Sequence, residues 1–254
     1  MGILEKTIRG NWLIYYIIRT LYEFFFSNIF FEYECKVFKY LNRKNNLQVV
    51  DIGSSNKVFS RFIARYLNNS KFYCFEPLFF LHKQLKIKKN NNTSILIKKG
   101  CGEKSKKITI YTPYKKVVNF FLYFKSFSSI DKNFLIKNLF YYFKNINFEF
   151  KKTNIVIKKL DSFKIKPDII KIDTENYELN VLLGSLKTIK KSRPIIMLEN
   201  PSVKIHMILT KLNYEKYQFI RKYKKLIKVK NNNKHSYNYF YICKKKKINS
   251  LFKF

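Results

Sequence analysis

Short apolar runs alternate with helical patterns over most of the chain. The runs end at turns or prolines, which is typical of buried strands. We predict strands at 47–53, 71–77, 94–99, 106–113, 153–161, 168–173, 193–199, 214–220 and 236–243. Between them, apolar residues recur at helical spacing in 58–67, 78–89, 179–189 and 202–212. Alternating strands and helices indicate an α/β domain with a mainly parallel sheet and helices on both faces.

The ends of the chain and one internal stretch depart from this alternation. Segments 214–220 and 236–243 flank a polar stretch at 231–234, which predicts an antiparallel hairpin at the end of the sheet. Residues 114–152 are rich in Lys and Phe and show no clear period. The predicted divisions are an N-terminal helical extension (1–46), a main domain (47–244) and a frayed basic tail (245–254).

The segment 11–31, NWLIYYIIRTLYEFFFSNIFF, is strongly apolar. Arg19 and Glu23 interrupt it near the middle, whereas a membrane-spanning helix needs about 20 residues with few or no charges. It also lacks the basic start and small-residue cleavage site of a signal peptide. The pattern fits a helix that packs on the domain or lies at a membrane surface. A peripheral membrane contact through 11–31 is therefore one expected interaction.

The formal net charge of +36 is extreme for 254 residues. Such a field attracts polyanions, which brings nucleic acid and anionic membranes in as partners. Codon bias is a second explanation, because Lys, Asn, Ile, Phe and Tyr are abundant and Ala64 is the only alanine. The Lys residues are spread along the whole chain, and this favours codon bias with a solvated basic surface over a selected nucleic-acid site.

The cysteines and histidines give no sign of a metal site. Cys35, Cys74, Cys101 and Cys243 form no CxxC pair, and none stands near a histidine at ligand spacing. We expect neither bound metal nor a disulfide framework, and a reducing cytoplasm as the location of the protein.

Acidic residues and glycines stand where several predicted strands end. The first strand ends at Asp51 and Gly53, and the second ends at Glu76. In parallel sheets the carboxyl ends of the strands form the ligand-binding edge. An acid at the end of the second strand is placed to accept hydrogen bonds from ribose hydroxyls. Further residues expected at this edge are Gly100, Cys101 and Gly102 in a tight turn, then Asp173 and Glu199.

A longer string, KIDTENYELNVLLGSLKTIKKSRPIIMLE (171–199), resembles the FkbM-type methyltransferases. That family carries the motifs D-I-G-A-N-x-G-x-x-S, F-E-P and K-I-D-x-E-G-x-E-x-x-V-L-x-G, followed by R-P-x-x-x-x-E. The matching residues are Asp51, Ile52, Gly53, Ser60, Phe75, Glu76, Pro77, Lys171, Ile172, Asp173, Glu175, Glu178, Val181, Leu182, Gly184, Arg193, Pro194 and Glu199. The segments KKLDSF (158–163) and SFSSID (126–131) also look like parts of the family, so the resemblance covers roughly 47–220.

The resemblance implies a Rossmann-like seven-stranded methyltransferase sheet, mostly parallel with a C-terminal antiparallel hairpin, and S-adenosylmethionine as the cofactor. By the same resemblance, Asp51, Gly53 and Ser55 line the methionine end of the cofactor. Glu76 binds the ribose hydroxyls, and Cys101 and Gly102 border the adenine. Members typically methylate hydroxyls, often on sugars or polyketides, so the expected acceptor is a small molecule or a glycan. We place the region that binds the acceptor at 114–152.

Two positions depart from the family pattern. Asn176 replaces the glycine of the E-G pair, which is a mild change because asparagine tolerates positive φ. Lys57 stands at the second glycine of the cofactor loop, where a cation near a helix N-terminus opposes the helix dipole. Three readings stay open for Lys57: it pairs with the carboxylate of the cofactor, it points to solvent, or it marks an impaired loop.

Methyl transfer to a hydroxyl calls for positioning and for a base that takes the hydroxyl proton. Asp173 and Glu175 are the predicted bases. Lys171 lies two residues before Asp173 on the same face of its strand, where we expect it to tune the pKa of Asp173 or to contact the acceptor. Two alternatives remain. The charge of +36 suggests a nucleic-acid methyltransferase or an RNA-binding protein, and Lys57 suggests a catalytically impaired relative.

Overall fold

The computed structural model describes residues 11–21, 33–55, 57–78, 87, 89–143, 147–229 and 236–254. Contacts divide the chain into two compact units. The smaller unit comprises Met1–Ser27 and Lys107–Ile155, and the larger unit comprises Asn28–Lys106 and Val156–Phe254. The domain limits that we placed at 46 and 244 stay predictions.

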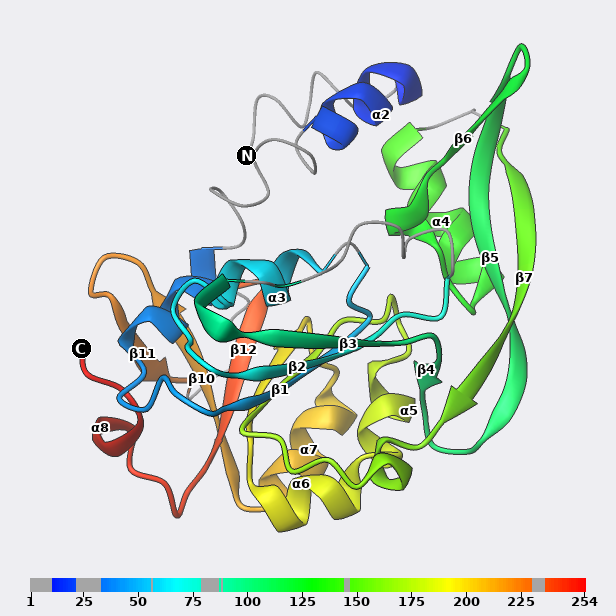
Figure 1. Ribbon diagram of the computed structural model, residues 1–254. Coiled ribbons are helices and arrows are strands. Elements are labelled where there is room, and N and C mark those ends of the chain that lie inside the picture. The colour runs from blue at the N-terminus through cyan, green and yellow to red at the C-terminus, as the bar shows by residue number, and fades with distance from the viewer. Residues whose placement is uncertain are drawn as a thin grey trace. The chain divides into compact units, whose positions relative to one another are not determined.

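An eight-stranded sheet forms the larger unit (Figure 1). In spatial order its strands are β11 (Lys225–Lys228), β10 (Tyr214–Ile220), β12 (Asn238–Cys243), β9 (Ile195–Glu199), β8 (Ile169–Ile172), β1 (Gln48–Ile52), β2 (Lys71–Phe75) and β3 (Thr93–Ile97). The strands from β9 to β3 pair in parallel, and the last three pair antiparallel. The mostly parallel sheet with antiparallel strands at its end is thereby confirmed.

The predicted count of seven strands is not confirmed, because this sheet has eight. After β10 the chain turns and pairs back as β11, before it returns as β12 between β10 and β9. The segments 214–220 and 236–243 are antiparallel neighbours, as predicted, but they do not follow each other directly along the chain. The short strand β11 makes the first hairpin with β10.

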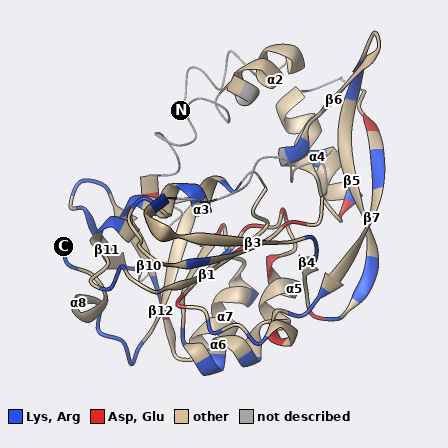
Figure 2. Cartoon of the chain, viewed as in Figure 1, with Lys and Arg blue, Asp and Glu red and all other residues tan. Residues whose placement is uncertain are grey.

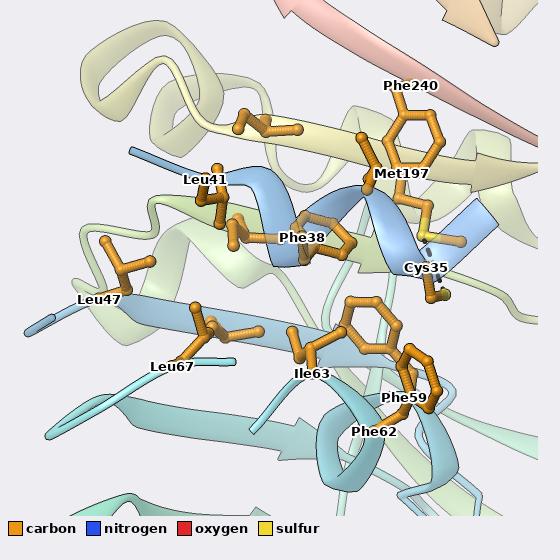
Figure 3. Packing of buried hydrophobic residues seen from close by; sticks show 14 of the residues in the cluster. Cys35, Phe38, Leu41, Leu47, Phe59, Phe62, Ile63, Leu67, Met197 and Phe240 are labelled. Atoms are coloured by element: carbon orange, nitrogen blue, oxygen red, sulfur yellow. Dashed lines mark hydrogen bonds between the residues drawn. The ribbon is translucent and has the colours of Figure 1, made fainter. Parts of the chain in front are cut away.

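Two hydrophobic clusters cover the two faces of this sheet. One contains residues of α3 (Val58–Ile63) and η2 (Tyr33–Tyr40), and the other contains residues of α5 (Glu178–Leu183), α6 (Leu186–Ser192) and α7 (Val203–Lys211). Neighbouring residues of one strand divide between them, because Val49 belongs to the first cluster and Val50 to the second. Figure 3 shows the first cluster, in which Phe38 packs between α3 and the sheet.

Some predicted helices differ in the structure. The predicted helix at 179–189 is two helices, α5 and α6, that meet at Gly184 and Ser185. The predicted helix at 78–89 falls mostly outside the described residues. Short 3-10 turns lie at η4 (Lys89–Asn91) and η6 (Leu160–Phe163).

The C-terminal tail is not frayed, in contrast to our expectation. A short helix, α8 (Ile248–Leu251), precedes Phe252, which is buried and forms an antiparallel bridge with Leu41. Asn42 donates from its side-chain amide to the carbonyls of Asn249 and Ser250. The apolar side chain of Phe252 explains the packing, since its burial removes a large ring from water.

The smaller unit contains a hairpin, two helices and an aromatic cluster. Its elements are α2 (Trp12–Leu21), β5 (Lys106–Val117), β6 (Phe120–Tyr123), η5 (Lys125–Phe127), α4 (Lys132–Phe143) and the first part of β7 (Glu149–Lys158). β7 ends in the larger unit, where its last residues pair in parallel with β4 (Gly100–Cys101). The cluster consists of buried Phe124, Phe127, Leu135, Leu139 and Phe143.

The part of 11–31 that the structure describes is α2, and one face of α2 packs on this aromatic cluster. Trp12, Tyr15 and Tyr16 lie against it, with the ring centroids of Tyr15 and Phe143 5.1 Å apart. No helix in the described ranges is long and apolar enough to cross a membrane.

Candidate active site

The carboxyl ends of β1, β2, β8 and β9 lie at one edge of the sheet. Asp51 of β1 stands opposite Cys74 of β2 and Lys171 of β8 in the strand register. Glu199 ends β9 at the same edge and is half-buried. The parallel pairing therefore brings four of the predicted strand ends together, as expected for a ligand-binding edge.

Gly53 permits a close approach between two of these strand ends. Its φ is +78°, and a Cβ at this position would lie 1.7 Å from the carbonyl oxygen of Asp173. The backbone amides of Gly53 and Ser54 both donate to the carbonyl of Phe75, at 3.0 and 3.1 Å. Only glycine fits here, because any side chain would push β8 away from β1.

Glu76 anchors the loop that follows β1. Its Oε2 accepts from the backbone amide of Ser55 at 2.8 Å, and its Oε1 accepts from that of Leu78 at 3.0 Å. The carboxyl group is almost fully buried, and this burial raises its pKa from 4.5 to about 7, against the two amide hydrogen bonds that lower it. Each oxygen keeps a second lone pair for another donor.

A buried polar cluster lies between α3 and the sheet, where the surrounding side chains are apolar. It consists of Asp51, Lys57, Ser60, Lys171 and Asp173. Asp51 is fully buried, and its Oδ2 accepts from the hydroxyl of Ser60 at 2.6 Å. Burial raises the pKa of Asp51, while the positive charge of Lys171 opposes the shift. Two lysines and two aspartates balance in formal charge, which lowers the cost of burying them.

Lys171 and Asp173 form an ion pair at the end of β8. The Nζ of Lys171 donates to Oδ2 of Asp173 at 2.7 Å. The side chain of Lys171 is 5% exposed and that of Asp173 is 25% exposed, so the pair runs from the core toward the edge. Lys171 also lies over the ring of Phe59 in α3, 5.6 Å from its centroid. Asp173 is thus the member of the cluster that is open to an incoming molecule.

Lys57 occupies a conformation that suits glycine and turns its side chain inward. Its φ is 52° and its ψ is 32°, which is the left-handed region, and this explains why the family pattern has a glycine there. The residue is only 1% exposed, so the reading in which it points to solvent is wrong. Burial lowers the pKa of Lys57, and Cys74 and Asp51 partly oppose that shift.

Glu175 and Asn176 form the turn after β8. Both are exposed and both have positive φ, 50° and 75°, so the asparagine does replace a glycine that needs this conformation. Glu178 opens α5 and accepts at Oε1 from the backbone amide of Thr174 at 2.9 Å and from its hydroxyl at 3.1 Å. Glu178 therefore fixes the turn that carries Glu175.

The segment 100–102 is not the tight turn that we expected. Gly100 and Cys101 form strand β4, and the Cys101 side chain is buried, which raises the pKa of its thiol. A Cβ on Gly184 would lie 2.0 Å from the carbonyl oxygen of Gly102. A Cβ on Gly102 would lie 3.0 Å from the ring of Tyr177. The sulfur of Cys101 is buried and is therefore not presented to a ligand.

Several motif residues have structural rather than ligand-binding contacts. Asp161 accepts at Oδ1 from the backbone amide of Thr188 at 2.7 Å and at Oδ2 from that of Lys187 at 3.1 Å, and so caps α6. Arg193 donates to the carbonyl of Leu212 at 2.6 Å. Ser60, which we matched to the family without assigning a role, bonds Asp51. Its place nine residues after Asp51, one helical turn into α3, was the signal for this contact.

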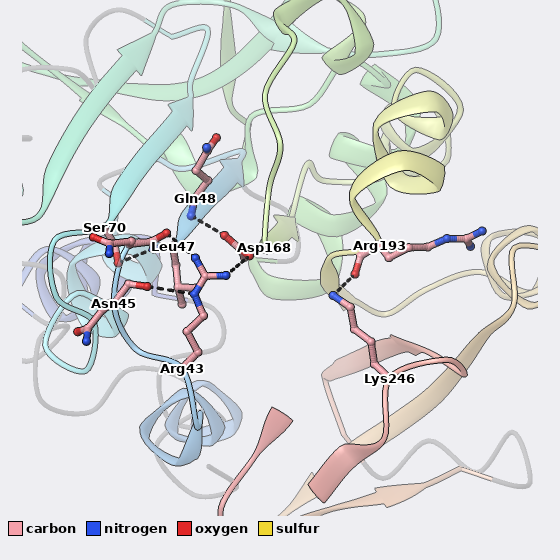
Figure 4. A network of polar contacts seen from close by, with 9 residues as sticks. Arg43, Asn45, Leu47, Gln48, Ser70, Asp168, Arg193 and Lys246 are labelled. Carbon is pink, nitrogen blue, oxygen red and sulfur yellow. Dashed lines mark hydrogen bonds and ion pairs between the residues drawn. The ribbon is translucent and has the colours of Figure 1, made fainter. Parts of the chain in front are cut away.

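A second polar network lies at the opposite, amino-terminal edge of the parallel strands (Figure 4). Arg43 pairs with Asp168 at 3.3 Å and donates to the carbonyls of Asn45 and Asn46. Asp168 also accepts from the backbone amide of Gln48 at 2.9 Å. A cavity of about 130 Å³ beside them is lined by Arg43, Asp168, Lys246, Ser250 and apolar residues. These side chains make hydrogen bonds and an ion pair with each other and with the backbone, so the network connects the segments that begin β1 and β8.

The residues at the carboxyl edge fit the expected cofactor. Oδ1 of Asp51 and Oγ of Ser54 are two of six buried side-chain polar atoms that have no hydrogen-bond partner among the described residues. They lie at the end of β1 and in the loop that follows it, where a polar ligand would supply the missing partner. S-adenosylmethionine carries ammonium, carboxylate and ribose groups that match an acidic, amide-rich edge. No group of metal-ligating side chains occurs in the described part of the chain.

Comparisons with known proteins give a family match and several similar structures. The family model described as the Methyltransferase FkbM domain matches residues 51–237. A search of curated proteins gives no match. Among solved structures, the chain is similar to methyltransferase FkbM from Methylobacillus flagellatus KT, with 13% identity and a TM-score of 0.46 over 80% of this chain and 45% of that one. The chain thus spans less than half of that protein.

A second similar structure is precorrin-6y C5,15-methyltransferase from Geobacter metallireducens GS-15, with 11% identity, a TM-score of 0.37 and coverage of 82% of this chain and 85% of that one. A third is the C-terminal domain of precorrin-6Y C5,15-methyltransferase from Rhodobacter capsulatus, with 9% identity, a TM-score of 0.31 and coverage of 80% and 82%.

Proposed function

The chain belongs to the FkbM methyltransferase family, and from this premise we propose that it transfers a methyl group from S-adenosylmethionine to a hydroxyl of a small molecule or glycan. The observation that carries the proposal is Glu76, a buried carboxylate at the end of β2. Backbone amides of Ser55 and Leu78 hold it beside the loop of Gly53. This arrangement presents an oriented acceptor for two ribose hydroxyls.

The remaining cofactor contacts follow from the loop geometry. Asp51 and Ser54 supply buried polar atoms without partners for the methionine end. Ser54 was not among the predicted cofactor residues, whereas Ser55, which was, donates its backbone amide to Glu76. Gly102 and the backbone of Cys101 supply the border for the adenine. When bound, S-adenosylmethionine supplies an electrophilic methyl group on a sulfonium, so the protein needs to position the acceptor and take one proton.

Asp173 is the proposed base. It lies at the carboxyl edge, its carboxylate is partly exposed, and its Oδ2 is fixed by Lys171. One oxygen is thus oriented by the lysine, and Oδ1 is left to accept the hydroxyl proton. Glu175 is exposed on the adjoining turn and is the second proposed base. Lys171 acts on the reaction by holding Asp173 rather than by contact with the acceptor, because it is buried.

Methyl transfer from labelled S-adenosylmethionine to hydroxyl-bearing acceptors tests the proposal. We expect Asp173→Asn to lower turnover by roughly 100-fold, the usual contribution of a positioned base. Cofactor affinity should stay within about threefold of wild type, because Asp173 is not a proposed cofactor ligand. Glu103→Ala, which removes an exposed carboxylate, is the matched control.

If Asp173→Asn leaves turnover unchanged, Asp173 is not the base, and Glu175 is the remaining candidate. Methylation of an amine or a carbon in place of a hydroxyl would overturn the assignment of the acceptor. Wild-type protein that binds the cofactor but methylates no acceptor in the panel fits the impaired relative that Lys57 suggested.

A further inference from the structure

Exposed apolar side chains are concentrated in the smaller unit. Eighteen large hydrophobic residues are exposed in the described part of the chain, and twelve of them belong to the smaller unit, which holds less than a third of the sequence. They lie on the β5–β6 hairpin, on α2 and on α4. Single exposed apolar residues need no explanation, but such a concentration marks an interaction surface.

The tip of the β5–β6 hairpin is its most exposed part. Val118 is 79% exposed, Phe120 is 73% exposed and Phe121 is 51% exposed. Val117 pairs with Phe120, so Val118 and Asn119 form a two-residue turn. Val118 has a φ of 52° at the first central position of the turn, where glycine is the usual residue and a β-branched side chain is strained. Val118 therefore occupies a backbone conformation that its side chain disfavours.

α2 adds a second apolar surface to the same unit. Leu13, Ile14, Ile17, Ile18 and Leu21 are all exposed along its outer side, while the opposite side packs on the aromatic cluster. Phe124, which directly follows β6, contacts the ring of Tyr16 at 5.4 Å between centroids. The helix has ten residues and is thus about 15 Å long, half the thickness of a hydrocarbon core. It is suited to lie in an interface.

The charge of the smaller unit complements an anionic surface. Residues 107–155 contain nine lysines against only two acids, Asp131 and Glu149. Lys115 and Lys116 lie near the end of β5, within three residues of the tip. Figure 2 shows basic residues along this hairpin and β7. Each lysine near an anionic bilayer contributes about 1 kcal/mol to the free energy of membrane binding. Apolar side chains that enter the bilayer strengthen binding further, because they are removed from water.

We propose that the smaller unit docks on the surface of an anionic lipid bilayer, with the β5–β6 tip and the outer side of α2 inserted among the lipid headgroups. Nucleic acid does not explain the aliphatic residues, because it is bound through cations and stacked aromatic rings. A second copy of the chain would bring two sets of lysines together. The proposal does not depend on the reaction, so its failure would leave the proposed function standing.

Flotation of the full-length protein with phosphatidylcholine vesicles, with and without phosphatidylglycerol, tests the proposal. We expect binding that requires phosphatidylglycerol and that falls at least about tenfold in the double variant Phe120→Asp/Phe121→Asp. The matched control is Tyr223→Asp, an exposed aromatic residue among lysines beside β11 of the larger unit. It should bind vesicles within about twofold of wild type.

Trp12 is the only tryptophan and lies in α2, so its fluorescence reports this helix directly. A blue shift with anionic vesicles supports insertion. Absence of vesicle binding would overturn the proposal, and so would equal losses in the hairpin variant and the Tyr223 control. Binding of RNA without binding of vesicles would assign the surface to nucleic acid, and a dimer that the hairpin variant dissociates would assign it to a second copy.

Discussion

Lys57 shows how one residue changes the reading of a cofactor loop. Its backbone lies where the family pattern has glycine, and its side chain is buried near Asp51 and Cys74. An added buried cation is costly unless nearby anions offset it. Asp51 is the nearby carboxylate that offsets the charge of Lys57, so the cluster accommodates this lysine. The sequence revealed the departure but not the direction of the side chain, which depends on packing against α3.

The charge balance of this cluster leads to a prediction about Lys57 and Asp51. We expect Lys57→Met and Asp51→Asn each to lower the free energy of unfolding by about 2 kcal/mol, because each leaves an opposite charge buried with less compensation. The double variant should be at least about 1 kcal/mol more stable than the sum of the single losses implies. Urea denaturation measures the coupling, and strictly additive losses would show that the two charges do not interact.

Glu76 gives a prediction about pH. Its pKa is raised to about 7 in the folded protein, so the fold binds a proton more tightly than the unfolded chain does. The stabilisation from this proton is complete below about pH 4.5 and is lost as the pH rises to about 7. Between pH 5 and pH 8 the wild type should therefore lose about 2 kcal/mol of unfolding free energy that Glu76→Gln does not lose. The difference in stability between the two proteins should shift by this amount in favour of the variant. A constant difference would contradict the raised pKa.

At the scale of elements, the short apolar runs predicted the strands of the larger sheet except β11, because strands such as β1, β8 and β9 are buried on both faces. The prediction of elements failed where contacts between residues distant in sequence determine the local structure. α5 and α6 separate at Gly184, where the backbone closely approaches the carbonyl of Gly102, a residue far away in sequence. Residues 114–152 gave no period because the β5–β6 hairpin exposes its apolar tip, so polar and apolar positions do not mark its faces.

The contact between Gly102 and Gly184 gives the prediction at this scale. Gly184→Ala should lower the free energy of unfolding by at least about 2 kcal/mol, because its Cβ would meet a backbone carbonyl that cannot turn away. Lys190→Ala, an exposed substitution in α6, should stay within about 0.5 kcal/mol of wild type. Thermal denaturation that finds the two variants alike would mean that this approach is looser than the structure shows.

For the whole molecule, the sequence predicted the ligand-binding edge but not the separation into two contact units. Motif spacing placed Asp51, Glu76 and Asp173 together, and the strand register explains why, since β1 pairs with both β2 and β8. The grouping of Met1–Ser27 with Lys107–Ile155 depends on aromatic packing between segments that are distant in sequence. The composition gives a net charge of +36 but does not show where this charge acts. In the structure, part of it lies in the smaller unit, which also carries the exposed apolar side chains of α2 and the β5–β6 hairpin.

Calorimetry with S-adenosylmethionine tests the central claim, that the carboxyl edge of the larger sheet binds this cofactor through Glu76. The account predicts saturable binding to the wild-type protein and an affinity at least about tenfold lower in Glu76→Ala, a loss of about 1.4 kcal/mol. The exposed-acid control Glu103→Ala should bind as wild type does. Folded wild-type protein that binds no cofactor, or equal affinity in wild type and Glu76→Ala, would contradict the claim.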